Sequence, residues 1–148
     1  MVENQRVILL VEDDPDHELL TVRALRKSNI VNEIKIARDG EEAIEALFSD
    51  GPNAVLPQVI LLDLKLPKVD GLEVLRRIRE SERTQMLPVV ILTSSDEESD
   101  IVRSYKLGVN SYIQKPVNFT EFQDVVKQLG MYWLLVNSKP PASAFSVS

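Results

Sequence analysis

The sequence predicts an α/β fold: a doubly wound, five-stranded parallel sheet covered by helices on both faces, in three αβα layers. Two observations predict it. Short apolar runs alternate with amphipathic segments along the chain, and three of the runs consist only of valine, isoleucine and leucine, as in parallel strands covered on both faces. Right-handed crossovers between such strands place helices on both sides. The predicted strands are residues 7–11, 34–37, 59–62, 89–92 and 111–113.

Five helices are predicted, one after each strand, from apolar residues at helical spacing that form one buried stripe per helix. The stripes are Leu19, Val22 and Leu25; Ala43, Ala46 and Leu47; Leu72, Leu75 and Ile78; Ile101 and Tyr105; and Phe122, Val125, Val126 and Leu129. Helix-start signals agree with these boundaries. They are Asp14 before Pro15, and three residues followed at the third position by glutamate: Asp39 with Glu42, Asp70 with Glu73, and Asn118 with Glu121.

The composition indicates one globular domain and excludes several kinds of function. The chain has 148 residues, a net charge of −6, and no apolar run long enough to span a membrane. Its N-terminus lacks the features of a secretory signal, so a cytoplasmic protein is expected. Without cysteine and with His17 as its one histidine, it lacks the ligands of thiolate or multi-histidine metal sites. The acidic balance also argues against direct nucleic-acid binding.

The C-terminal residues depart from the alternating pattern. Gly130 ends the last predicted helix, residues 131–136 are apolar, and residues 137–148 are rich in serine, proline and alanine. A solvated tail does not usually carry a pair such as Tyr132 and Trp133. We therefore predict a domain over residues 1–130 and an extension over residues 131–148 with a flexible end. The apolar part of the extension is expected to pack in a symmetric dimer, with folding back over its own domain as the alternative.

Polar residues follow four of the predicted strands, where ligands bind in open α/β sheets. They are Glu12, Asp13 and Asp14 after the first strand, Asp63 after the third, Thr93 and Ser94 after the fourth, and Lys115 after the fifth. Three gathered carboxylates, those of Glu12, Asp13 and Asp63, repel one another and are best explained by a bound cation. With oxygen ligands only, the cation should be Mg²⁺ before Ca²⁺. Asp14 is expected to cap a helix rather than bind the metal.

A magnesium site of this kind suggests phosphoryl chemistry. Lys115 offers a positive charge and Thr93 a hydroxyl for phosphoryl oxygens. The sequence has no glycine-rich phosphate-binding loop, which disfavours a bound nucleotide. Asp63 can itself accept the phosphoryl group, because an ionised carboxylate is a competent nucleophile once a cation neutralises the incoming charge.

Together these residues resemble the receiver domains of response regulators. The resemblance rests on Glu12-Asp13, on Asp63 within Ile-Leu-Leu-Asp-Leu-Lys-Leu-Pro-Lys-Val-Asp-Gly, on Thr93-Ser94, and on Tyr112-Ile-Gln-Lys-Pro. It covers about residues 6 to 130 and is specific, because the four motifs occur in the right order and spacing. The Thr-Ser-Ser and Lys-Pro-Val-Asn segments, the long loop before the third strand and the Tyr-Trp tail are most similar to the regulators of cyanobacterial phytochromes.

The resemblance implies a flavodoxin-like sheet of order 2-1-3-4-5 and a phosphoryl group transferred to Asp63 from a sensor histidine kinase. It implies Mg²⁺ held by Asp13, Asp63, the Lys65 carbonyl and, through water, Glu12. Thr93 and Tyr112 would then switch the face formed by the fourth helix, fifth strand and fifth helix, which would bind a downstream protein and the dimer partner. It also implies a cis bond between Lys115 and Pro116. Lys65 and Ser95 occupy two positions that tune the lifetime of the phosphate.

Two other functions compete with the phosphoacceptor switch. A Mg²⁺-dependent phosphohydrolase acting through an aspartyl phosphate would usually carry a second aspartate two residues after the nucleophile, where this chain has Lys65. A receiver-like scaffold that is never phosphorylated would be favoured if Asp63, Thr93 or Lys115 were missing. Six basic side chains are predicted to be solvated: His17, Lys65, Lys68, Arg76, Arg77 and Arg79.

Overall fold

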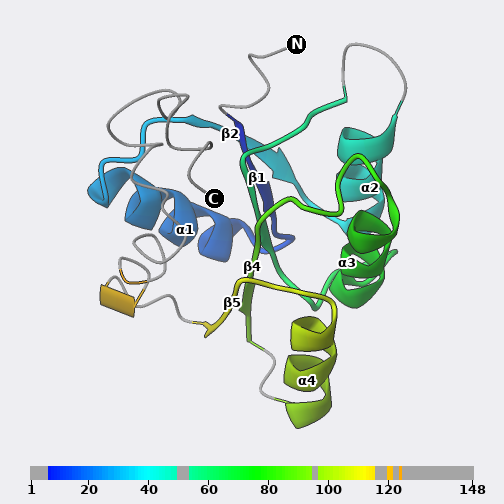
Figure 1. The fold of residues 1–148 in the computed structure, drawn as a ribbon. Coiled ribbons are helices and arrows are strands. Elements are labelled where there is room, and N and C mark those ends of the chain that lie inside the picture. The colour runs from blue at the N-terminus through cyan, green and yellow to red at the C-terminus, as the bar shows by residue number, and fades with distance from the viewer. Residues whose placement is uncertain (1–6, 50–53, 95–96, 116–119, 122–123, 125–148) are drawn as a thin grey trace, which may run out of the picture.

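The computed structural model describes residues 7–49, 54–94, 97–115, 120, 121 and 124. Within them the chain alternates strands and helices, as predicted (Figure 1). The strands are β1 (Val7–Val11), β2 (Glu33–Ala37), β3 (Val59–Leu62), β4 (Val89–Thr93) and β5 (Ser111–Gln114). The helices are α1 (Pro15–Lys27), α2 (Gly40–Phe48), α3 (Gly71–Glu80) and α4 (Glu98–Lys106).

The five strands form one parallel sheet in the order β2-β1-β3-β4-β5, which confirms the predicted topology. Every residue of β1, β3 and β4 is buried, as their continuous apolar sequences indicate. Three strands are one residue longer than predicted: β2 begins at Glu33, β4 ends at Thr93 and β5 ends at Gln114. Each added residue is paired in register with a neighbouring strand, so pairing rather than apolar character sets these ends.

Two apolar clusters cover the two faces of the sheet, because side chains alternate along each strand. Leu9, Val11, Ile60 and Leu62 face the cluster that includes residues of α2 and α3. Residues on the other face, such as Ile8 and Leu10, pack with Leu25 of α1. Figure 1 shows α1 on one side of the sheet and α2, α3 and α4 on the other. The observed layers therefore match the predicted three-layer arrangement.

The predicted caps of the described helices are present. Asp14 accepts hydrogen bonds from the N–H groups of Asp16 and His17, and Asp39 accepts one from Glu42 at 2.8 Å. Asp70 accepts one from Glu73 at 3.0 Å. Thr120, Glu121 and Asp124 are helical, at the place of the fifth predicted helix. Its apolar stripe, the cap Asn118, the Lys115–Pro116 bond, Ser95 and the extension over residues 131–148 lie outside the described residues.

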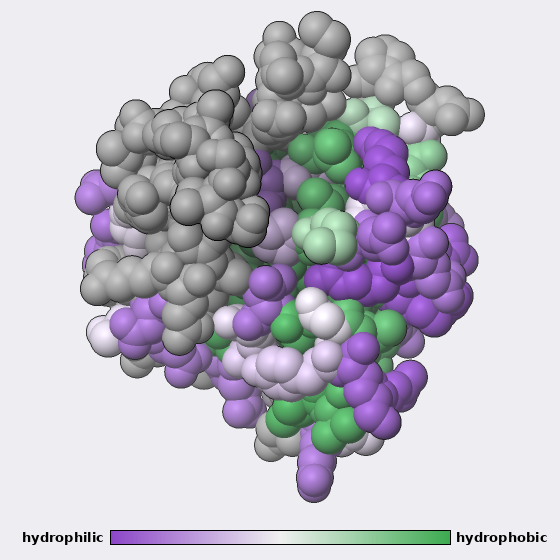
Figure 2. All heavy atoms as spheres, viewed as in Figure 1, coloured by the Kyte–Doolittle hydropathy of each residue, from purple (hydrophilic) through white to green (hydrophobic). Residues whose placement is uncertain are grey.

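Strongly hydrophilic residues gather over the side of the molecule where α2 and α3 lie (Figure 2). The prediction that the charged side chains of α3 are solvated holds for Arg76 and Arg77, whose side chains are 47% exposed. It is only partly correct for Arg79, which is half-buried and donates hydrogen bonds to the carbonyls of Gln85, Leu87, Leu107 and Gly108. Burial lowers the pKa of this guanidinium. This arginine joins the end of α3 to the segments after α3 and α4. In the described part of the chain, no helix is long and apolar enough to cross a membrane.

Candidate functional site

The carboxyl ends of four strands bring the predicted site residues to one edge of the sheet. Backbone hydrogen bonds continue past the strand ends, so the residues that follow remain tied to the sheet. Glu12 N–H donates to the Ala37 carbonyl at 2.9 Å, Asp63 N–H to Val11 at 3.1 Å, and Lys115 N–H to Thr93 at 2.8 Å. These backbone hydrogen bonds therefore fix the positions of the residues that carry the side chains of the site.

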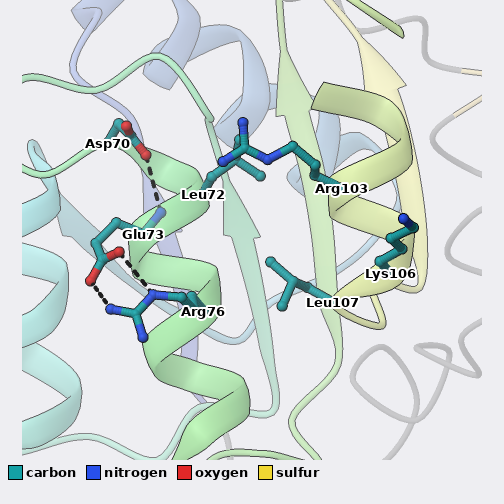
Figure 3. A pocket seen from close by; sticks show the side chains of 7 residues that line it. All are labelled: Asp70, Leu72, Glu73, Arg76, Arg103, Lys106 and Leu107. Atoms are coloured by element: carbon teal, nitrogen blue, oxygen red, sulfur yellow. Dashed lines mark hydrogen bonds and ion pairs between the residues drawn. The ribbon is translucent and has the colours of Figure 1, made fainter. Parts of the chain in front are cut away.

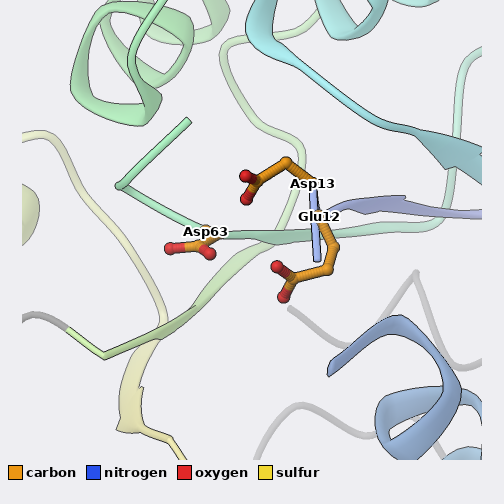
Figure 4. Close-up of side chains that lie close together, drawn as sticks. All are labelled: Glu12, Asp13 and Asp63. Atoms are coloured by element: carbon orange, nitrogen blue, oxygen red, sulfur yellow. The ribbon is translucent and has the colours of Figure 1, made fainter. Parts of the chain in front are cut away.

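Three carboxylates meet there, those of Glu12, Asp13 and Asp63. Each provides an oxygen, and these oxygens all lie within 4.8 Å of one another (Figure 4). Glu12 and Asp63 are 2% and 4% exposed, whereas Asp13 is exposed. Two anionic side chains are thus held out of water next to a third that opens to solvent. Such a cluster is costly unless cations compensate it.

One compensating cation is the ammonium of Lys115, whose side chain is only 4% exposed. It donates a hydrogen bond to Glu12 Oε1 and another to Asp63 Oδ2, the latter at 2.9 Å. With all three carboxylates ionised, the cluster and this one ammonium carry two excess negative charges. A divalent cation would balance them, and an all-oxygen donor set suits a hard ion such as Mg²⁺. The residues present therefore fit a divalent metal site.

The Asp63 carboxylate is oriented by donors on both of its oxygens. Oδ1 accepts hydrogen bonds from Thr93 Oγ1 at 2.7 Å and from the Lys65 N–H at 3.0 Å. Oδ2 accepts the bond from Lys115. Thr93, which is fully buried, comes from β4, and Lys65 comes from the loop after β3. Asp63 is therefore held from three separate points of the chain.

Burial and hydrogen bonding shift the pKa values of the carboxylates at this edge in opposite directions. Burial raises the pKa of Glu12, and its hydrogen bond with Lys115 partly opposes that rise. The pKa of Asp14 is lowered, chiefly by the hydrogen bond from the Asp16 N–H. Asp14 thus acts as the cap of α1, as predicted. For Glu12, burial disfavours the ionised form.

The Lys65 side chain reaches residues at the start of α4. Its ammonium lies 3.6 Å from Glu97 Oε1 and 3.4 Å from Asp100 Oδ2, and Asp100 is the main cause of its raised pKa. It is 54% exposed, so the predicted solvated position holds, but these ion pairs were not predicted. Asp13, Lys65, Asp100 and Arg103 also line a depression of about 540 Å³ beside the acidic cluster.

Two further residues differ in how well their positions were predicted. Tyr112, proposed as a switch, lies half-buried in β5 opposite Ile91 and packs against the α2–α3 cluster. His17 was predicted to be solvent-facing, and this is only partly correct. It is 38% exposed, but its Nδ1 lies 3.0 Å from Lys115 Nζ. The signal in the sequence was its place in the first helical turn after Glu12-Asp13, which turns the ring toward the acidic edge.

Comparison with known proteins agrees with this geometry. The family model of the response regulator receiver domain matches residues 8–127. Response regulator Rcp1 of Synechocystis sp. is 40% identical over 139 residues, which cover 93% of this chain and 95% of that protein. A probable methanogenesis regulatory protein, FilR2 of Methanothrix harundinacea, is 42% identical over 139 residues, covering 93% and 90% of the two chains.

Solved structures show the same relationship. The bacteriophytochrome response regulator AtBRR is 50% identical, with a TM-score of 0.77 over 90% of this chain and 98% of that one. The Mn²⁺-bound form of Rcp1 is 40% identical, with a TM-score of 0.75 over 92% and 99% of the two chains. The resemblance seen in the sequence motifs is thus confirmed by the family model, by full-length relatives and by the fold, and the chain belongs to the receiver domain family of two-component response regulators.

Proposed function

We propose that this response regulator accepts a phosphoryl group on Asp63 and thereby switches a protein-binding surface. The observation that carries the proposal is the way Asp63 is held. Its carboxylate is nearly buried, is fixed by Thr93, Lys115 and the Lys65 N–H, and stands beside two further carboxylates. A side chain that served only the stability of the fold would not require two anionic neighbours.

In the proposed reaction an oxygen of Asp63 forms a bond to phosphorus as the phosphorus–nitrogen bond to the kinase histidine breaks. The electron pair of that bond returns to the imidazole nitrogen. Lys115 and Thr93 supply the hydrogen-bond donors that face negative charge on the phosphoryl oxygens. Glu12, Asp13, Asp63 and the Lys65 backbone carbonyl would hold Mg²⁺, which neutralises charge on the incoming group.

The switch follows from the neighbours of Asp63. A phosphoryl group on Asp63 would compete for the hydroxyl of Thr93, which now donates to Oδ1. Thr93 ends β4 and pairs with Gln114 of β5, two residues beyond Tyr112. A change at Thr93 is therefore placed to reach Tyr112 and the surface of α4 and β5. We propose that this surface, together with the following helix, binds the downstream protein.

The switch is favoured over the alternative of a phosphohydrolase. An acid two residues after the nucleophile would serve such an enzyme, but this position holds Lys65, whose ammonium is engaged by Glu97 and Asp100. We therefore propose that the chain is not an enzyme beyond its own phosphorylation and slow dephosphorylation. The unphosphorylated scaffold is disfavoured because Asp63, Thr93 and Lys115 are all present and in contact.

The test is the intact mass of the protein after incubation with Mg²⁺ and acetyl phosphate. The wild type should gain one phosphate that is released by alkali. Asp63→Asn should gain none, while Asp16→Asn, which alters an exposed carboxylate of α1, should behave as the wild type. Rapid release of many equivalents of phosphate would support the phosphohydrolase. An unchanged mass of the wild type would leave the receiver-like scaffold that is never phosphorylated as the remaining function.

The names of the relatives suggest the kinase partner. Several similar solved structures are those of phytochrome or bacteriophytochrome response regulators. We therefore propose that a cytoplasmic histidine kinase, with a phytochrome as the first candidate, phosphorylates this chain. Transfer from a purified phytochrome kinase should label the wild type and not Asp63→Asn. Labelling of both variants would contradict transfer to Asp63.

The extension over residues 131–148 supports a further part of the proposal. Its apolar sequence, with Tyr132 and Trp133, favours a dimer formed with the α4–β5 face. Sedimentation should show a smaller complex for a chain ending at Gly130 than for the full chain. Equal oligomeric states of the two chains would show that the extension takes no part in the dimer contact.

A further inference from the structure

The Lys115 ammonium has three N–H groups, and the described residues provide an acceptor for each of them. Two acceptors are the carboxylates of Glu12 and Asp63, and the third is the imidazole of His17, with Nδ1 at 3.0 Å from Nζ. An ammonium can only donate hydrogen bonds. The contact at 3.0 Å is a hydrogen bond when His17 Nδ1 is the acceptor, which is the Nε2–H tautomer of the imidazole.

His17 is held in place by the start of α1. Its N–H donates to Asp14 Oδ1 at 3.3 Å, within the cap that fixes the first turn of the helix. Its Nδ1 lies farther from the neighbouring carboxylates, 3.7 Å from Asp14 Oδ2 and 3.9 Å from Glu12 Oε2. The shortest polar contact recorded for the ring is thus the one with Lys115, which is 98 residues away in sequence.

The chemical type of the third acceptor matters. A carboxylate at this position would be a third anion competing for the same ammonium, and it would draw Lys115 away from Asp63. A neutral imidazole accepts one N–H without adding negative charge. It leaves the other two N–H groups directed at Glu12 and Asp63, the carboxylates at the centre of the site.

We infer that His17 is a positioning residue for phosphoryl transfer: it fixes the Lys115 ammonium by accepting its third hydrogen bond. This inference rests on the proposed role of Lys115 in phosphorylation of Asp63. Without the acceptor, the third N–H faces water and the ammonium gains freedom to rotate and shift. Rates of group transfer fall when a reacting or charge-stabilising group loses its fixed position.

Two substitutions separate acceptor chemistry from side-chain bulk. His17→Asn retains an oxygen near the place of Nδ1, and His17→Leu retains size but has no acceptor. If His17→Leu does not fold, His17→Ala replaces it as the variant that lacks a hydrogen-bond acceptor. Because His17 is 38% exposed and lies in the first turn of a helix, both substitutions should be tolerated, which thermal unfolding checks.

The first measurement is the ¹⁵N-edited NMR signal of the Lys115 ammonium, assigned by its loss in Lys115→Met. Protons of a buried, fully hydrogen-bonded ammonium exchange slowly enough to be observed. We expect the signal in the wild type and in His17→Asn, and its broadening or loss in His17→Leu. This measurement uses unphosphorylated protein and does not depend on the proposed function.

The second measurement is the rate of phosphorylation by acetyl phosphate with Mg²⁺. We expect a rate about five- to tenfold lower for His17→Leu and within about twofold of wild type for His17→Asn. Equal rates and signals for all three proteins would overturn the inference, and so would equal losses in both variants. A wild type that is never phosphorylated would contradict the proposed function instead, while the NMR comparison would still decide the contact between His17 and Lys115.

Discussion

Two ionic networks in this molecule have similar chemistry and opposite surroundings. At the carboxyl edge of the sheet, Lys115 bridges Glu12 and Asp63, and all three side chains are at most 6% exposed. On the surface of α3, Arg76 bridges Glu73 and Glu80, and Arg77 adds a further contact to Glu73. Figure 3 shows the contact between Glu73 and Arg76 in the pocket between α3 and α4.

The comparison shows that burial, and not the number of ion pairs, decides how much each network matters for stability and for the position of its carboxylates. Pairing with Arg76 and Arg77 lowers the pKa of Glu73 to about 2, yet solvent screens these exposed charges. In the buried network, desolvation is severe enough that loss of one partner leaves uncompensated charge. The exposed network therefore adds little to stability, whereas the buried one keeps reactive carboxylates in place at a cost.

Removing the cation of the buried network should have the largest effect. Lys115→Met leaves the carboxylates of Glu12 and Asp63 without their shared partner, and we expect the free energy of unfolding to fall by about 3–5 kcal/mol. Phosphorylation should slow about 100-fold or more. Urea unfolding without divalent cations measures the first effect, and intact mass over time measures the second.

The matched control, Lys68→Met, removes an exposed lysine that pairs with Asp39 and Glu41. If Lys115→Met and Lys68→Met lower the free energy of unfolding equally, burial of the Lys115 network is not the cause of the larger expected loss.

An intermediate effect on stability and phosphorylation is expected when the backbone that holds Asp63 is disturbed and the charges of the Lys115 network are unchanged. A Cβ on Gly71 would lie 2.2 Å from the Asp63 carbonyl oxygen and 2.5 Å from Leu64 Cα, so backbone must shift. We expect Gly71→Ala to cost about 1–3 kcal/mol of stability and to slow phosphorylation about tenfold.

Gly108→Ala is the control for this substitution. It strains a backbone with φ of +74°, but its nearest neighbour is Arg79 rather than the Asp63 loop. It should lose stability and keep the phosphorylation rate. A Gly71→Ala protein that is phosphorylated at the wild-type rate would show that the site does not depend on this close contact.

The smallest effect is expected in the exposed network. Because the folded-state pKa of Glu73 is about 2, below its ordinary value of 4.5, its ionised form stabilises the fold above about pH 4.5. That contribution is lost as the pH falls toward 2. Glu73→Gln should therefore lower Tm by about 1 to 2 °C at pH 7. The difference should shrink in 1 M salt and vanish near pH 2. A difference that persists at low pH and high salt would rule out an ionic origin.

The sequence predicted the sheet and the convergence of the site for physical reasons. The buried strands β1, β3 and β4 have continuous apolar sequences, and the carboxyl ends of parallel strands share one edge. Residues directly after these strands, such as Asp63 and Lys115, could therefore be placed together from the order of the amino acids alone.

The contacts that were not predicted join segments far apart in the chain. Arg79 reaches carbonyls near residue 107, 28 positions away, and His17 reaches Lys115 across 98 positions. Lys65 pairs with Asp100 of α4. Helical periodicity describes which face of a helix is apolar, but it carries no information about the loop or side chain that a long polar residue will meet in three dimensions.

The central claim is that Asp63 receives the phosphoryl group, and locating the label tests it most directly. Borohydride reduces an aspartyl phosphate to homoserine, which tandem mass spectrometry can place in the sequence. After phosphorylation by acetyl phosphate with Mg²⁺, we predict homoserine at position 63. We predict neither homoserine at Asp13 nor 2-amino-5-hydroxypentanoic acid, the product of a reduced glutamyl phosphate, at Glu12. A reduced residue at any other aspartate or glutamate, or no homoserine at position 63 in a protein that has gained phosphate, would contradict the account.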